Sequence, residues 1–331
     1  MRTATMTTTT ELDDFEGLTH RYERELLAHC YRMSGSFHEA EDLVQETFLR
    51  AWKASAQFQG RSSVRTWLYR IATNVCLDML DGRRRRARPM DLGPSGSAET
   101  FHATTQPEAT WLEPIPDARA LPEDGDPAEL AAARETLRLA FVNALQHLPA
   151  RQRAVLILRE VLRWQASEVA ELLETSVASV NSALQRARAQ LGDIDVTPES
   201  AVEPLDEEKR ALLDRYVAAF ESYDMDALIP LLREDAILTM PPYELWLQGV
   251  DQVRTWFLGH GVGCRGSRLV PLMANGCPAF GQYRPSPGGG HEPWALQVLE
   301  LSGDGRIAHI NSFLDTQRLF PLFGLPPRLP A

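Results

Sequence analysis

The chain has 331 residues, of which 44% are hydrophobic and 24% are charged, values that are ordinary for globular proteins and sufficient for two or three domains. Its formal net charge of -11 does not by itself indicate a nucleic-acid binder. However, arginines cluster at 61–88 and 151–188, whereas acids crowd 108–135 and 193–226. A local basic patch matters more for nucleic-acid binding than the total charge does.

The sequence argues against several classes of protein. The threonine-rich stretch 1–10 lacks the apolar core of a signal peptide, and no apolar run approaches the length of a membrane span. The four cysteines show neither C-x-x-C nor Cys/His ligand spacing. We therefore expect a reduced, cytoplasmic protein without metal, cofactor or membrane contact, whose N-terminus at 1–14 is disordered.

The first predicted elements are three amphipathic helices, at 15–33, at 40–52 and from about residue 63. Ser36 and Glu39 form a capping box before the second helix. Its apolar face comprises Ala40, Leu43, Val44, Thr47, Phe48, Ala51 and Trp52, and its opposite face carries Glu41, Asp42, Gln45, Glu46 and Arg50. We expect the second helix to present an acidic surface.

The third helix is basic on its outer face. Its apolar stripe comprises Val64, Trp67, Leu68, Ile71, Ala72, Val75, Met79 and Leu80. The outer face offers Arg65, Tyr69, Arg70, Thr73 and Asn74, and the helix ends in a basic run from Arg83 to Arg88. We expect Trp52 and Trp67 to pack in the core of a bundle over 15–88. An acidic helix and a basic helix that share one core favour a domain that binds a protein and nucleic acid at the same time.

Residues 89–130 read as a linker, because they are rich in Pro, Gly, Ser, Thr and acids without a sustained period. Residues 131–192 are helical again, with a helix expected at 151–162. A helix-turn-helix pattern follows, with helices at 166–173 and from 177, which Val177 among other apolar residues is expected to pack together. The exposed side of the second of these helices carries Ser179, Asn181, Ser182, Gln185, Arg186 and Arg188, with Ser176 at its start.

A second acidic linker is expected at 193–204, before a domain over 205–325. The pattern there predicts helices at 206–223, 224–232 and 250–260 and a strand at 236–240. Two further strands near 294–301 and 306–314 are joined by a hairpin at 302–305. Helices followed by antiparallel strands predict an α+β domain.

Three stretches resemble known families. "AEDLVQETFLRAW" and "FQGRSSVRTWLYRIATNVCLDMLDGRRRR" resemble region two of extracytoplasmic-function (ECF) sigma factors. "LPARQRAVLILREVLRWQASEVAELLETSVASVNSALQRARAQL" resembles sigma region four, although Asn181 to Ala183 stand where most relatives carry Lys or Arg. "YVAAFESYDMDALIPLLREDAILTMPP" resembles SnoaL-like polyketide cyclases, whose fold is cone-shaped. A subset of ECF sigma factors carries this extension, so the resemblance covers almost the whole chain.

The resemblance implies a multidomain protein, with two all-α domains followed by an α+β cone-shaped domain. It implies two partners: core RNA polymerase, through its β′ clamp helices and β flap, and promoter DNA. The residues implied in polymerase binding are Asp42, Gln45, Glu46, Leu49 and Arg50. Those implied in reading the minus-ten element are Arg61, Ser62, Arg65, Tyr69, Arg70, Asn74, Arg83 and Arg84, together with the loop 58–63. Those implied at the minus-thirty-five element are Ser176, Ser179, Asn181, Ser182, Gln185, Arg186 and Arg188.

Several alternatives remain open from the sequence. The acidic face of the second helix is also typical of a solvated surface, and the arginine run of a solvated helix end. By resemblance to the cyclases, the C-terminal domain could be catalytic, with Asp235, His260, His309 and Asp315 as candidate groups, but no pair has a spacing that fixes a site. We expect instead that this domain regulates the sigma domains in cis, with a small-molecule ligand in the cone left open. A simple helix-turn-helix repressor would not explain residues 40–88.

Overall fold

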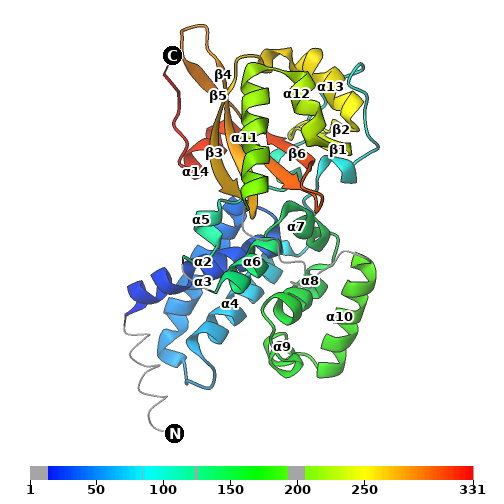
Figure 1. Ribbon diagram of the computed structural model, residues 1–331. Coiled ribbons are helices and arrows are strands. Elements are labelled where there is room, and N and C mark those ends of the chain that lie inside the picture. Colours follow the sequence, from blue (N-terminus) through cyan, green and yellow to red (C-terminus); the bar gives the residue numbers. More distant parts are fainter. Residues whose placement is uncertain (1–13, 84, 124–125, 193–205, 331) are drawn as a thin grey trace. The chain divides into compact units, whose positions relative to one another are not determined.

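The computed structural model describes residues 14–83, 85–123, 126–192 and 206–330. The chain forms two compact units, one from Met1–Arg86 and Leu112–Ala201 and the other from Ala87–Trp111 and Val202–Ala331 (Figure 1). The segment 87–111, which separates the two helical domains in sequence, therefore belongs to the unit of the C-terminal domain. In the described ranges, no helix combines the length and apolar character needed to cross a bilayer.

The first unit begins with the predicted three-helix bundle of α2 (Phe15–Ser34), α3 (Phe37–Ala54) and α4 (Val64–Leu80). Asp14, Ser36 and Ser63 cap the three helices, because each side chain accepts a hydrogen bond from a backbone N–H of the first turn. The core between the helices is filled by fully buried side chains, among them Leu26, Leu27, Tyr31, Met33, Phe37 and Leu68. The bundle thus forms from the apolar stripes that the sequence predicts.

The turn between α2 and α3 requires glycine. Gly35 adopts a φ of 74° and its N–H donates to the carbonyl of Tyr31, which ends α2. A Cβ at this position would also come within 2.6 Å of Leu112 Cδ2. The close approach lets the segment that starts at Leu112 pack directly over the turn.

The rest of the first unit is helical; helices were predicted from residue 131, but the first two of them begin within the stretch 89–130 that was expected to be a linker. It comprises α5 (Asp117–Ala120), α6 (Pro127–Glu135), α7 (Leu139–Gln146), α8 (Ala150–Leu156), α9 (Ala166–Leu172) and α10 (Val177–Leu191). The helix expected at 151–162 changes at Ile157 to a π-helical turn, Ile157–Val161, that the Leu162 N–H closes by donating to the Ile157 carbonyl at 2.9 Å. Helices α9 and α10 form the predicted helix-turn-helix.

The second unit contains one six-stranded sheet with the strand order β2-β1-β6-β5-β4-β3. Its strands are β1 (Leu232–Thr239), β2 (Trp246–Gln248), β3 (Arg268–Ala274), β4 (Cys277–Pro285), β5 (His291–Leu301) and β6 (Ile307–Phe313). Only the β1–β6 pair is parallel among the described strands. Its helices are α11 (Glu207–Ser222), α12 (Met225–Leu228), α13 (Val250–Leu258) and α14 (Thr316–Leu322). The predicted α+β fold is confirmed, although the sequence did not predict β2, β3, β4 or α14.

Helix α11 packs its predicted apolar face, Leu212, Tyr216, Ala219 and Phe220, into the core of this unit. The Tyr216 hydroxyl donates to Gln297 Oε1 on β5 at 2.9 Å, so the helix is fixed to the concave side of the sheet by a buried polar contact as well. The curved sheet and its helices enclose a small cavity, as expected of a SnoaL-like cone.

Short 3-10 turns complete the two units. In the first unit, Ser55–Gln57 follows α3 directly. In the second unit, such turns lie at Pro89–Asp91, Glu108–Thr110, Ile229–Leu231 and His260–Cys264.

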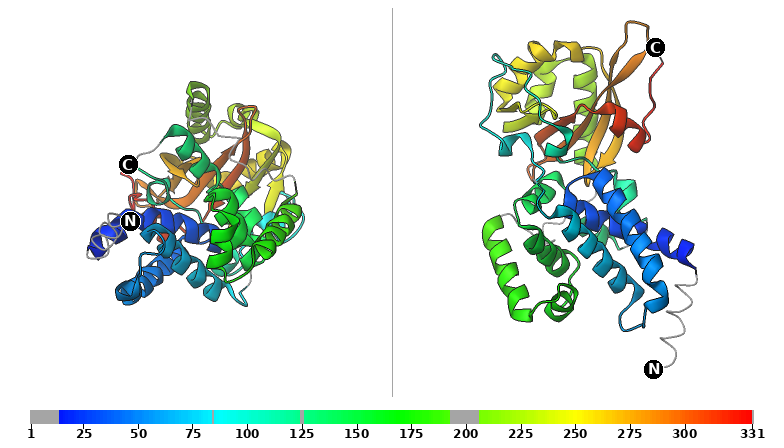
Figure 2. Two further views of the ribbon diagram at one scale, coloured as in Figure 1. Left: turned by 90° about the horizontal axis from the view of Figure 1, so that it is seen from below. Right: turned by 180° about the vertical axis from the view of Figure 1, so that it is seen from behind.

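The segment 87–111 contains no long helix or strand, but it is packed onto the C-terminal domain. In both figures its cyan trace runs beside α13 and β2 (Figures 1 and 2). The Gly96 N–H donates to the carbonyl of Trp246 at 2.9 Å, and Thr105 forms an isolated antiparallel bridge with Tyr243. Ala98 is buried in the core of the domain. The segment is thus held by backbone hydrogen bonds to the chain that precedes and forms β2.

Candidate functional site

Helix α3 presents the surface expected to bind polymerase. Asp42, Gln45, Leu49 and Arg50 are exposed and Glu46 is half-buried, so the five residues share one accessible face. Trp52 is 62% exposed and Leu49 45% exposed, and the expectation that Trp52 packs in the core is therefore wrong. A large apolar pair among acidic residues is typical of a protein-binding surface. The sequence signal for this apolar pair was the helical spacing of three residues between Leu49 and Trp52, which lie outside the buried face of the helix.

Ion pairs organise this face internally. Arg50 Nε donates to Glu46 Oε1 at 2.7 Å and Arg50 Nη1 to Asp78 Oδ2 on α4 at 3.0 Å. The two carboxylates raise the pKa of the Arg50 guanidinium further. Asp42 and Gln45 are thereby the more available polar contacts.

The loop between α3 and α4 forms an open pocket. The pocket has a volume of about 270 Å³ and is lined by Gln57, Phe58, Gln59, Arg61, Ser62, Trp67 and Arg70. The rings of Phe58 and Trp67 lie 4.9 Å apart, so Trp67, expected in the core, is a half-buried wall of the pocket. Aromatic side chains under a rim of arginines can stack and hold an unpaired base.

The outer face of α4 differs from the prediction at two positions. Tyr69 and Thr73 are buried, so their assignment to the outer face is wrong. Thr73 Oγ1 lies 3.0 Å from Nε2 of the buried His29, and the Tyr69 ring packs edge-on against Trp164 at 5.9 Å. Burial raises the pKa of the Tyr69 hydroxyl. Asn74, by contrast, is exposed, as its proposed contact with an unstacked base requires.

The arginines on α4 are engaged in ion pairs. Arg65 Nε donates to Glu25 Oε2 at 2.7 Å, and its guanidinium lies over the Tyr69 ring. Arg70 Nη2 donates to Glu171 Oε1 on α9 at 2.7 Å. Both pairs are solvent-accessible, so DNA phosphates can compete for these guanidinium groups.

The basic run after α4 is neither a helix end nor a free tail. The helix ends at Leu80, and Arg86 and Arg88 are each only 7% exposed. Arg83 Nη1 donates to Glu39 Oε1 at 3.0 Å, and Arg86 Nη2 lies 3.1 Å from the same atom. Arg84 lies outside the described residues. Arg83 and Arg86 are therefore paired, whereas the sequence left contact with DNA and a solvated helix end as open alternatives for the run.

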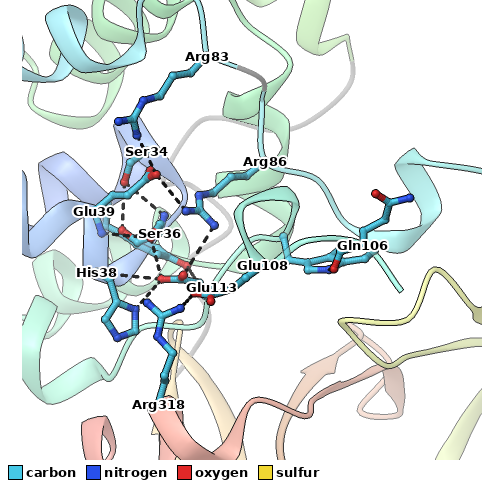
Figure 3. Close-up of polar contacts among 12 residues, drawn as sticks. Ser34, Ser36, His38, Glu39, Arg83, Arg86, Gln106, Glu108, Glu113 and Arg318 are labelled. Carbon is cyan, nitrogen blue, oxygen red and sulfur yellow. Dashed lines mark hydrogen bonds and ion pairs between the residues drawn. The ribbon is translucent and has the colours of Figure 1, made fainter. Parts of the chain in front are cut away.

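A buried carboxylate, Glu113, holds the start of α3 in place (Figure 3). The Ser36 hydroxyl donates to Glu113 Oε2 at 2.7 Å, and Nδ1 of His38 lies 3.0 Å from the same oxygen. Arg86 Nη1 lies 3.7 Å from Glu113 Oε1. A carboxylate at a helix N-terminus is favoured by the helix dipole. The sequence reasoning missed Glu113, whose one weak signal was its position as an acidic residue within the apolar run 111–116.

The helix-turn-helix half is packed against the bundle within the first unit. Arg32 donates from Nη2 to Thr136 Oγ1 at 2.8 Å, and Arg153 from Nη1 to Gln146 Oε1 at 2.6 Å and to the carbonyl of Met33. Burial lowers the pKa of both arginines to about 10. Together with the Tyr69–Trp164 and Arg70–Glu171 contacts, these interactions cover part of the face expected to read the minus-ten element.

Helix α10 presents its predicted recognition face to solvent. Asn181, Ser182, Gln185, Arg186 and Arg188 are all exposed. Ser176 caps the helix by accepting from the Ser179 N–H at 3.1 Å, and Arg188 pairs with Glu160 at 2.6 Å. Val177, expected to pack against α9, is instead 44% exposed. Amide and hydroxyl groups along one helix face can read base edges in the major groove.

The candidate catalytic groups of the C-terminal domain have separate, structural partners. Asp235 is exposed and pairs with Arg233 at 2.5 Å, and Asp315 caps α14 by accepting from the Arg318 N–H. His309 Nδ1 lies 3.3 Å from Glu300 Oε1, whereas His260 stacks on Phe101 and Trp256. The structure does not bring these four groups together as an acid–base pair.

Family models match the two helical domains, and relatives match most of the chain. The model described as Sigma-70 region 2 matches residues 18–86, and that described as Sigma-70, region 4 matches 138–191. The chain is 50% identical over 319 residues to the ECF RNA polymerase sigma factor SigG of Mycobacterium tuberculosis, which covers 96% of this chain and 85% of that protein. It is 27% identical over 312 residues to the ECF RNA polymerase sigma factor SigJ of the same species, covering 90% of this chain and 89% of that protein.

A solved structure shares the same order of domains. The crystal structure of Mycobacterium tuberculosis SigJ matches with a TM-score of 0.60 and 22% sequence identity, covering 94% of this chain and 99% of that chain. At this identity the match concerns the fold alone. The similarity therefore extends through the C-terminal domain as well as the two helical domains.

Proposed function

This chain belongs to the extracytoplasmic-function class of sigma-70 factors, and we propose that its own C-terminal domain controls its activity. As a member of this class it binds core RNA polymerase and promoter DNA and initiates transcription. The observation that carries the regulatory part is the placement of residues 87–111, which connect region two to region four but fold as part of the C-terminal unit.

Polymerase binding is assigned to the α3 surface defined by Asp42, Gln45, Glu46, Leu49 and Arg50. Its exposed carboxylates and apolar Leu49 suit a partner helix pair with basic and apolar side chains, for which we propose the β′ clamp helices. Region four is assigned to the β flap. These contacts would place the factor on the polymerase in the cytoplasm, where its template lies.

Promoter reading is assigned to two separate surfaces. The pocket between Phe58 and Trp67, with the exposed Asn74, takes an unstacked base of the minus-ten element, while Arg61 and Arg70 contact phosphates. The recognition face of α10 reads the minus-thirty-five element as duplex. The domain boundaries given above, with linkers at 89–130 and 193–204, stay predictions.

Promoter binding requires the first unit to open. From their positions at minus-ten and minus-thirty-five, the two promoter elements are about 25 base pairs apart, which corresponds to about 85 Å of duplex at about 3.4 Å per base pair. In the structure, Arg70 of region two and Glu171 of region four are joined at 2.7 Å. Both surfaces cannot engage their elements in this arrangement, so the described form is a closed, resting one.

The C-terminal domain is placed to influence this opening through the connecting segment. The segment leaves the first unit at Arg86 and re-enters it at Leu112. Arg86 and Glu113, which flank it, are fixed to the start of α3, and its interior is hydrogen-bonded to the C-terminal domain. A conformational change in the C-terminal domain therefore acts on the segment 87–111, whose two ends are fixed to region two.

Run-off transcription with purified core polymerase tests the sigma function. A promoter would first be selected from a library randomised at both elements by capture of open complexes with the full-length chain. We expect transcripts that depend on the chain and on both selected elements. Transcription that occurs equally without the chain, or after scrambling both elements, would refute the assignment.

A further inference from the structure

The C-terminal domain encloses a cavity that the sigma function does not use. Its volume is about 230 Å³, and its walls include Phe101, Trp256, Phe257 and Trp294. A dry cavity of about 150 Å³ is large enough for benzene. The space therefore accommodates a single ring with a small polar substituent.

Two glutamines in the wall of the cavity offer hydrogen-bond donors. Gln297 Nε2 donates to Gln282 Oε1 at 2.9 Å, and Gln282 Nε2 donates to Ser267 Oγ at 3.0 Å. The Gln297 carbonyl oxygen in turn accepts from the Tyr216 hydroxyl. This chain of bonds occupies both amide oxygens, while each amide nitrogen carries a second N–H. The two glutamines thus offer donors to whatever occupies the cavity.

Arg284 supplies a positive charge at the same place. Its Cζ lies 3.2 Å from the centre of the Trp294 ring, and its Nη2 contacts Cys264 Sγ at 3.1 Å. Its Nε is buried without a hydrogen-bond partner among the described residues. Of the described residues that line the cavity, none is acidic. A cation and two amide donors without an internal carboxylate favour an anionic ligand rich in acceptor oxygens.

The wall formed by Phe101 connects the cavity to the sigma domains. Phe101 belongs to the segment 87–111 and stacks edge-on against Tyr243 at 5.4 Å and Trp256 at 5.1 Å. The cavity exists with Phe101 in place, so a ligand bound there contacts the segment directly. A ligand that gains this contact binds better when the segment is docked and so favours the docked state.

We propose that the cavity binds a monocyclic aromatic carboxylate, with its ring among Phe101, Trp256 and Trp294 and its carboxylate on Arg284. Binding holds the segment 87–111 on the C-terminal domain. This inference rests on the proposed regulatory function and gives it a ligand class. It identifies the ligand by chemistry alone, and benzoate is the simplest probe of that class.

The proposal is tested by titrating the full-length chain with benzoate, with binding measured by calorimetry and by tryptophan fluorescence. We expect saturable binding, and binding of the neutral analogue benzyl alcohol weaker by at least about tenfold. Arg284→Gln should lose benzoate affinity by a similar factor, whereas Arg284→Lys should retain part of it. Arg306→Gln, which removes an exposed arginine of the β5–β6 hairpin, is the matched control and should bind as the wild type does.

Proteolysis with a glutamate-specific protease measures whether benzoate binding in the cavity protects the segment 87–111. Glu99 is exposed within 87–111, so saturating benzoate should slow cleavage after Glu99 in the wild type and have less effect in Phe101→Ala. Absence of saturable benzoate binding, equal affinity for benzyl alcohol, or cleavage unchanged by bound benzoate would overturn the proposal. Run-off transcription by the same preparations without benzoate reports the sigma function separately, so failure of one is distinguishable from failure of the other.

Discussion

Arg88 donates from Nη2 to Glu300 Oε1 at 2.9 Å, and both side chains are buried. Arg88 is the last arginine of the run that follows α4, 212 residues away from its partner in sequence. Arg88 also contacts Asn311 Oδ1 at 2.9 Å, and the Asn311 amide donates to Glu300. The last arginine of a run for which the sequence left DNA contact and a solvated helix end open is therefore buried in the unit of the C-terminal domain.

Removing the charge of Glu300 should destabilise the C-terminal domain. Glu300→Gln leaves the Arg88 guanidinium buried without its counter-ion, which costs about 3–5 kcal/mol. Chemical denaturation at pH 7, followed by tryptophan fluorescence, measures the loss. Asp304→Asn in the exposed β5–β6 hairpin is the control and should change stability by less than about 0.5 kcal/mol.

The same pair predicts a pH dependence. Burial alone would raise the pKa of Glu300, but Arg88, His309 and Asn311 hold that pKa well below its usual range. The unfolded chain therefore binds the proton first as the pH falls. The stabilisation is complete above about pH 5 and is lost progressively at lower pH. Glu300→Gln should flatten this dependence, and equal acid sensitivity of variant and wild type would show that the pair does not contribute.

Reversing charge on α3 should weaken polymerase binding. In the double variant Asp42→Arg and Glu46→Arg, the exposed acidic face becomes basic while the buried face of the helix is untouched. We expect at least a tenfold loss of affinity for core polymerase, since about 1.4 kcal/mol corresponds to tenfold. Reversal of the exposed Glu208 and Asp214 on α11 is the control, and circular dichroism checks helical content. Normal affinity of the α3 variant would refute the assignment of this surface.

Asn74 and Asn181 provide matched tests of the two promoter-reading surfaces. Asn74→Ala should reduce permanganate reactivity of the opened strand more than it reduces duplex binding, because the side chain is proposed to contact an unstacked base. Asn181→Ala removes the same group from α10 and should instead weaken duplex binding at the minus-thirty-five element, by about 1–3 kcal/mol. Identical defects in both variants would contradict the separate roles.

Weakening the closed form of the first unit should increase DNA binding. Trp164 is buried against Tyr69, and Trp164→Ala removes that contact while leaving the face of α10 intact. We expect tighter binding of a single-stranded minus-ten oligonucleotide and, in small-angle scattering, a larger radius of gyration. Val177→Ala, a truncation at an exposed position of region four, is the control. A more compact variant, or weaker oligonucleotide binding, would contradict the closed resting form.

The sequence predicted those parts of the fold that depend on local periodicity. The three-helix bundle and the helix-turn-helix follow from apolar residues at helical spacing, as Leu68 and Ala72 on α4 illustrate. Strands β3 and β4 were missed because prolines and glycines such as Pro271 and Gly281 interrupt their alternation. The turn between them, at Asn275 and Gly276, has positive φ at both residues, and Asn-Gly is a hairpin signal that was available.

The candidate site was less predictable because it depends on contacts distant in sequence. Tyr69 lies on the outer side of its helix by periodicity, but it is buried because region four packs over it. Arg88 and Glu113 come from stretches without period, and their partners are brought near only by the fold. Exposed residues such as Asn74 and Asn181 were predicted correctly in placement because no distant segment among the described residues covers them.

The central claim, that the C-terminal domain controls sigma activity through residues 87–111, is tested most directly by run-off transcription. Transcript yield would be compared among the full-length chain, a chain that ends at Gly192, and Glu300→Gln, at equal occupancy of core polymerase. Removal of the domain frees the segment entirely, and loss of the Arg88 pair frees one end of it. We predict that both changes shift the yield several-fold and in the same direction. Yields equal to that of the full-length chain, from truncated protein that is still folded, would contradict the claim.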